Sequence, residues 1–71
     1  MLYEDFLKKL GLRLKMRRIQ LGLTQAQLGD KVGISENRIS EIESGRCNIT
    51  LKSLNKIFSA LEIDFLDIFK I

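Results

Sequence analysis

The chain has 71 residues and a formal net charge of +3 at pH 7, a size that suits one small domain with a single core. Its one cysteine, Cys47, and its lack of histidine exclude an internal disulfide and a structural zinc site. No apolar run reaches the roughly 18 residues of a membrane span, and the acidic start differs from the basic start of a signal peptide. We therefore expect one cytoplasmic domain over residues 1–71 that needs no metal, cofactor, small-molecule ligand or membrane.

The charge is unevenly distributed along the chain. Residues 1–60 hold eleven Lys and Arg against six Asp and Glu, whereas residues 61–71 hold one against three. A basic body favours the phosphate backbone of nucleic acid through counterion release. Solubility alone explains a surplus of this size equally well, so the choice depends on the motifs.

Period-two alternation is nowhere sustained and glycines separate the apolar segments, so the sequence predicts an all-α domain with five helices. The first helix is expected over roughly residues 4–21, with one face formed by Phe6, Leu10 and Leu14. A second apolar stripe on this helix exceeds what one buried face requires and consists of Leu12, Met16 and Ile19.

The second and third helices are expected to form a pair. Thr24 and Gln27 have the spacing of a capping box. Gly33 supplies the positive φ at which a helix ends before a tight turn, and Ser35 follows as a cap for the third helix. This order predicts a helix-turn-helix over about residues 24–44, whose second helix enters the major groove of DNA.

Two further helices complete the expected fold. Thr50 is expected to cap the fourth, whose apolar residues follow helical spacing at Leu51, Leu54, Ile57, Phe58 and Leu61. A short fifth helix begins at Asp64, because a carboxylate suits a helix N-terminus.

Five of the last seven residues are apolar, more than one helix face needs. We assign Leu66 and Phe69 to the core, and a dimerisation segment to about residues 62–71. The dimer interface is expected to contain Phe65, Ile68 and Ile71. The alternative is that all five residues fold onto the second stripe of the first helix.

The third helix has one polar face when its residues are placed at intervals of about 100°. Ile39 and Ile42 define the buried direction, with Asn37 and Ser44 opposite. Asparagine can bond adenine through two hydrogen bonds, glutamate can accept from cytosine N4, and serine suits several bases. Any exposed helix is polar, so the preceding helix and turn are what favour DNA readout here. We assign base reading to Ser35, Glu36, Asn37, Arg38, Ser40 and Glu41.

The same angular placement puts Glu43 close to the buried side of the third helix. A buried carboxylate requires a cationic partner, and Arg18, late in the first helix, is the candidate. We expect a structural ion pair between these two residues.

The sequence resembles the phage repressor/Cro (XRE-type) helix-turn-helix family from about Leu10 to Phe69, most strongly over residues 22–35 and also over residues 39–45 and 60–63. The resemblance implies a compact five-helix, lambda-repressor-like fold and homodimeric binding to inverted repeats in double-stranded DNA. Residues 46–54 also look similar to controller proteins of restriction-modification systems. Several antitoxins share that likeness, so an antitoxin that binds a partner toxin and represses its own operon is the alternative.

The resemblance also implies roles for individual residues. Glu36, Asn37 and Glu41 match the base-reading positions of the family, with Ser35 at their edge, while Arg18 and Glu43 match its buried ion pair. It places Gln25 against a DNA phosphate, and Arg46 and Asn48 in a loop that contacts the backbone. The expected set of DNA-backbone contacts is Thr24, Gln25, Ser44, Arg46 and Asn48. Gly29 stands where the family usually has alanine, at a cost in helix stability of about 0.5–1 kcal/mol.

Other classes of function find less support in the sequence. An enzyme is not expected, because no histidine, nucleophile–base pair or phosphate-binding glycine loop is present. Cys47 beside Arg46 could sense redox state, but a small tolerated side chain is the simpler interpretation.

Overall fold

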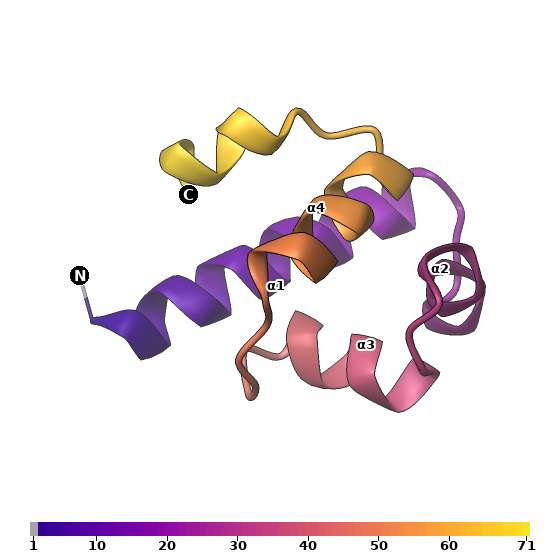
Figure 1. The fold of residues 1–71 in the computed structure, drawn as a ribbon, viewed down its shortest axis with the longest axis horizontal. Helices are drawn as coiled ribbons and strands as arrows, with labels where there is room; N and C mark the ends of the chain where they lie inside the picture. Colours follow the sequence, from indigo (N-terminus) through magenta and orange to yellow (C-terminus); the bar gives the residue numbers. More distant parts are fainter. Residues whose placement is uncertain (1) are drawn as a thin grey trace.

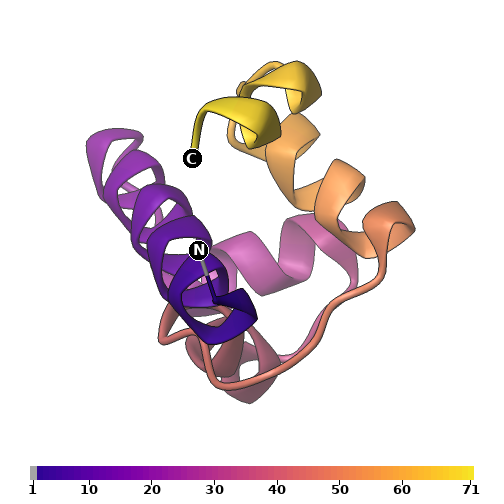
Figure 2. The same cartoon turned by 90° about the vertical axis from the view of Figure 1, so that its left-hand side faces the viewer.

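The computed structural model describes residues 2–71 and consists of helices joined by short loops (Figure 1). In chain order the elements are α1 (Tyr3–Gln20), α2 (Gln25–Val32), α3 (Glu36–Glu43), α4 (Leu51–Ala60) and the 3₁₀ helix η1 (Phe65–Lys70). The prediction of an all-α domain with five helical elements is confirmed. α3 and η1 lie on opposite sides of the layer formed by α1 and α4, in both views of the fold (Figures 1 and 2).

Side-chain caps begin four of the five elements where the sequence predicted them. The Thr24 hydroxyl accepts from the Gln27 amide at 3.0 Å, and the Gln27 side chain accepts from the Thr24 amide at 2.8 Å, so the capping box is complete. The Ser35 hydroxyl accepts from the Arg38 amide at the start of α3, and the Thr50 hydroxyl accepts from the Ser53 amide at the start of α4. The Asp64 carboxylate accepts from the Leu66 amide at 3.0 Å. These bonds satisfy backbone donors that a helix leaves unpaired at its start.

The core lies where α1, α2, α3 and α4 meet. Its most completely buried side chains come from all four helices and from the turn that follows α4: Leu14, Leu28, Ile39, Ile57, Phe58 and Leu61. One expectation for an apolar face is corrected, and one alternative for the last segment is excluded. Leu51 is 68% exposed at the first position of α4, although helical spacing puts it on the same face as Leu54 and Phe58. The second stripe of α1 is also exposed, so the last segment does not fold onto it.

The turn between α2 and α3 depends on two glycines. Gly33 ends α2 in the left-handed conformation, with φ of 72°. A Cβ on Gly29 would lie 2.3 Å from the carbonyl oxygen of Ile34, closer than non-bonded atoms approach. Gly29 is therefore what allows the turn to pass directly over α2, a packing role that outweighs its cost in helix propensity.

The prediction for the C-terminal segment is wrong about which residues face the core. Leu66 and Phe69 are 66% and 85% exposed. Phe65 instead packs edge-on against the Phe58 ring, with 5.3 Å between the two ring centroids. Ile68 and Ile71 are partly buried and also pack against the core. The predicted grouping at every third residue suits a 3₁₀ helix with three residues per turn. The two faces are exchanged because Phe65 packs against Phe58 of α4.

Candidate nucleic-acid interface

The outward face of α3 is open to solvent along its length. Glu36, Asn37, Glu41 and Ser44 are exposed and Ser40 is half-buried, whereas Ile39 and Ile42 are buried. The side chains of Glu36, Asn37 and Glu41 make no hydrogen bond or ion pair with any other residue in the range 2–71. They are thus free to hydrogen-bond to another molecule.

Two of the predicted base-reading residues are occupied within the chain. The Ser35 hydroxyl accepts from the Arg38 amide at 3.2 Å as the cap of α3. The Arg38 guanidinium turns towards the loop between α3 and α4, where Nη2 donates to the carbonyl oxygen of Asn48 at 2.8 Å. The structure therefore places Arg38 at the edge of the outward face of α3, where its hydrogen bond holds the loop between α3 and α4.

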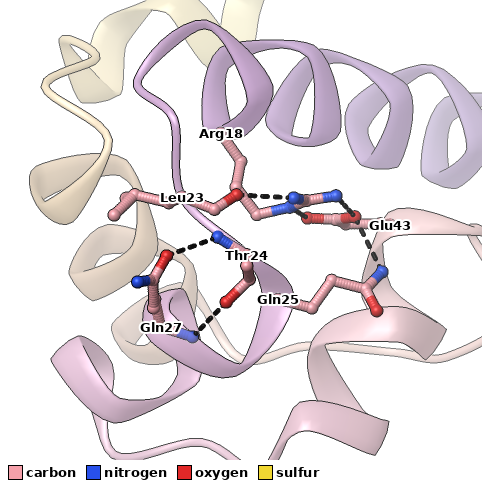
Figure 3. Close-up of polar contacts among 6 residues, drawn as sticks. All are labelled: Arg18, Leu23, Thr24, Gln25, Gln27 and Glu43. Atoms are coloured by element: carbon pink, nitrogen blue, oxygen red, sulfur yellow. Dashed lines mark hydrogen bonds and ion pairs between the residues drawn. The ribbon is translucent and has the colours of Figure 1, made fainter.

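The predicted ion pair between Arg18 and Glu43 is present and buried (Figure 3). Arg18 Nε donates to Glu43 Oε2 at 2.7 Å, and Nη2 donates to Oε1 at 3.1 Å. A third donor, Nη1, bonds the carbonyl oxygen of Leu23 at 2.7 Å. The two residues are 8% and 7% exposed. This two-point geometry is the arrangement in which an arginine compensates a buried carboxylate best, and it joins α1 to the end of α3.

Gln25 is a third member of this network, which the sequence did not predict. Its Nε2 donates to Glu43 Oε1 at 3.0 Å, and Figure 3 shows the Gln25 side chain reaching from the start of α2 towards Glu43. The first residue of α2 is thereby tied to the last residue of α3. Gln25 itself is half-buried and Thr24 is exposed, so both are accessible from solvent at the N-terminus of α2.

The loop between α3 and α4 carries the other expected backbone contacts. Arg46 is exposed, and its Nε donates to the Ser44 hydroxyl at 2.8 Å. The Oδ1 atom of Asn48 accepts from the Tyr3 hydroxyl at 2.7 Å. Cys47 is half-buried in this loop. The contact with Tyr3 was not predicted, because 45 residues separate the partners and no local pattern relates them.

Two arginines on this side of the molecule are not neutralised by carboxylates of the described residues 2–71. Arg38 and Arg46 pair with no carboxylate among residues 2–71, whose three ion pairs are Arg13–Asp67, Arg18–Glu43 and Lys70–Asp67. Their charges are available to an anionic partner. Within the same range no three acidic, cysteine or histidine side chains gather as metal ligands would, and no helix has the length and apolarity to cross a bilayer.

Comparisons with known proteins agree with this geometry. The chain is 42% identical over 55 residues to the cryptic phage CTXphi transcriptional repressor RstR of Vibrio cholerae, an alignment covering 78% of this chain and 49% of the relative. It is 40% identical over 50 residues to the antitoxin HipB of Escherichia coli, covering 70% of this chain and 57% of that protein. The chain thus spans about half the length of these two relatives.

A solved structure and a family model extend the match over most of the chain. The restriction-modification controller protein C.AhdI from Aeromonas hydrophila superposes with a TM-score of 0.84 at 31% identity, covering 94% of this chain and 96% of that one. A helix-turn-helix family model, HTH_3, matches residues 14–68. The chain therefore belongs to the HTH_3 helix-turn-helix family of DNA-binding transcriptional regulators, which are not enzymes.

Proposed function

We propose that this chain is a sequence-specific regulator of transcription that binds an inverted-repeat operator in double-stranded DNA as a homodimer. The observation that carries the proposal is the outward face of α3, where Asn37 and Glu41 are exposed and unpaired within residues 2–71 while Ile39 and Ile42 anchor the helix in the core. A polar helix fixed in this way after a helix–turn unit is the element that reads base edges in the major groove.

The side chains divide into base readers and backbone contacts. Asn37 is suited to two hydrogen bonds with adenine, and Glu36 and Glu41 to accepting from cytosine N4, with Ser40 as a smaller contributor. Gln25 and Thr24 at the start of α2 meet the phosphates on one side of the groove. Further phosphate contacts come from Ser44, which ends α3, and from Arg46 and Asn48 in the loop that follows and is tied back to α3 through Arg38.

The dimer is proposed to form through η1. Leu66 and Phe69 are apolar and exposed side by side on one face of this helix, which lies on the side of the molecule away from α3. Two copies joined there would leave both reading helices free, and half-sites about 34 Å apart match one turn of DNA. Phe65, Ile68 and Ile71, the interface expected from the sequence, would support this face from beneath, since they pack against the core of their own chain.

A controller protein of a restriction-modification system is the subfamily we favour. The support is the share of each relative's length that the match covers, which is 96% for the controller C.AhdI and 57% for the antitoxin HipB. The antitoxin alternative is supported by the 40% identity to HipB. Purification of the chain from its own host distinguishes the two, because a toxin partner would co-purify in constant proportion and a controller would be recovered as a homodimer.

Selection of bound sequences from random duplex DNA, at a stated salt concentration, tests the proposed function. We expect enrichment of an inverted repeat. Asn37→Ala should cost about 1–3 kcal/mol on the selected operator and relax the preference at one position in each half-site. Arg46→Ala should weaken binding to all duplexes alike and flatten the salt dependence. No enrichment with the wild-type protein, or an equal loss on every sequence from Asn37→Ala, would contradict the assignment of α3.

A further inference from the structure

We infer that Tyr3 is a positioning residue for DNA binding, because its hydroxyl turns the carboxamide of Asn48 so that the amide nitrogen faces an incoming phosphate. The inference rests on the proposed function and assigns a role to a residue outside the helix-turn-helix. It begins from one hydrogen bond: the Tyr3 hydroxyl donates to Oδ1 of Asn48 at 2.7 Å.

This hydrogen bond determines which end of the Asn48 carboxamide faces the solvent. Asn48 has one acceptor atom, Oδ1, and one donor group, the Nδ2 amide with two hydrogens. A phosphate oxygen only accepts hydrogen bonds, so a productive contact requires the amide to face outwards. With Oδ1 held by Tyr3, the end of the exposed side chain that remains for a ligand is the donor. The opposite orientation would present a partial negative charge to a phosphate.

The backbone of the loop is fixed independently of this bond. The Arg38 guanidinium donates to the carbonyl oxygen of Asn48 at 2.8 Å, which ties the loop to α3. On the other side a Cβ at Gly45 would lie 2.7 Å from Cα of Lys8, so the loop begins in direct contact with α1. The main chain of the loop is therefore held from two helices, from α1 at Gly45 and from α3 at Asn48, and Tyr3 is left to determine the orientation of the Asn48 side chain.

The arrangement also couples the loop to base reading. Arg38 follows Asn37 directly on α3, so the carbonyl of Asn48 and the reading face are joined through one residue. A phosphate bound at the Nδ2 amide of Asn48 would thus have a fixed position relative to the Asn37 side chain. Such contacts fix the position of a protein on the duplex before any base is read.

The test is a double-mutant cycle on DNA affinity with Tyr3→Phe and Asn48→Ala. Binding to a mixed-sequence duplex of about two helical turns is measured by fluorescence anisotropy, over a range of salt from about 50 to 200 mM. Tyr3→Phe keeps the ring and removes only the hydroxyl. We expect it to weaken binding about threefold to tenfold. Asn48→Ala should weaken binding at least as much as Tyr3→Phe does, and the slope of log affinity against log salt should stay unchanged, because a neutral carboxamide releases no counterion from a phosphate.

Two features of the cycle separate positioning from a general structural role. The double variant should bind DNA as Asn48→Ala does, because the Tyr3 hydroxyl has no side chain left to orient. Asn48→Asp should bind more weakly than Asn48→Ala, because the aspartate keeps an acceptor for Tyr3 and presents a negative charge to the phosphate. Asn55→Ala on the exposed side of α4 is the matched control and should bind as the wild type does. Thermal unfolding of every variant checks that the fold is retained.

The outcomes distinguish this inference from the function on which it rests. Wild-type protein that fails to bind any duplex overturns both. Wild-type binding that Tyr3→Phe leaves unchanged overturns only the role of Tyr3. Losses from Tyr3→Phe and Asn48→Ala that multiply in the double variant also overturn it, since they show that the two side chains act separately.

Discussion

Replacing one partner of the buried ion pair is expected to bring the domain close to unfolding. Glu43→Leu removes the carboxylate that accepts two bonds from Arg18 and one from Gln25. The Arg18 guanidinium, in a residue that is 8% exposed, then keeps only the Leu23 carbonyl as a partner. Loss of one member of such a pair costs about 3–5 kcal/mol. A domain of 71 residues has a total stability of roughly 4–11 kcal/mol, so a large part of it would be lost.

The double variant Arg18→Met/Glu43→Leu should recover most of that stability. Apolar side chains of similar volume leave no buried charge, and they replace the ion pair at little net cost. The assay is urea unfolding followed by circular dichroism for the wild type, Arg18→Met, Glu43→Leu and the double variant, from which the coupling energy is obtained. A double variant whose loss equals the sum of the two single losses would refute this account of the network.

Three further variants test the packing around the turn and the C-terminal segment. Phe69→Asp should leave the fold intact and give a monomer by sedimentation, because its side chain is 85% exposed, and an unchanged dimer would place the interface elsewhere. Phe65→Asp should instead destabilise the domain by at least about 2 kcal/mol, since it places a carboxylate against the Phe58 ring; equal thermal stability of the two variants would contradict this contrast. Gly29→Ala should lower stability by about 1–3 kcal/mol through overlap with the Ile34 carbonyl, and a stabilised variant would show that helix propensity dominates at this position.

Local signals account for the parts of the fold that the sequence predicted. A cap and the residue three positions later determine where a helix begins, so Thr24, Ser35, Thr50 and Asp64 were sufficient to place four starts. The buried pair was also predictable, because helical periodicity puts Glu43 on the inward side and a buried carboxylate requires a cation.

The features that the sequence did not predict depend on tertiary contacts. The bond from Tyr3 to Asn48 spans 45 residues and that from Gln25 to Glu43 spans 18, and neither belongs to a recurring local pattern. In the last segment, two of the three faces of the 3₁₀ helix are apolar, so spacing alone does not decide which of them faces the core. The contact between Phe65 and Phe58 determines the inward face.

The two unpaired carboxylates on α3, Glu36 and Glu41, have a consequence for a regulator that must find one site among many. In the proposed complex they enter a groove bordered by phosphates, while the nearest cation, Arg38, is directed at the loop. In that complex, DNA of arbitrary sequence would repel α3, and only duplexes that offer amino groups to Glu36 and Glu41 would compensate. Weak binding to other DNA would leave more of the protein free to reach its operator. The carboxylates would thus raise the preference for the operator over other sequences while lowering the affinity for DNA in general.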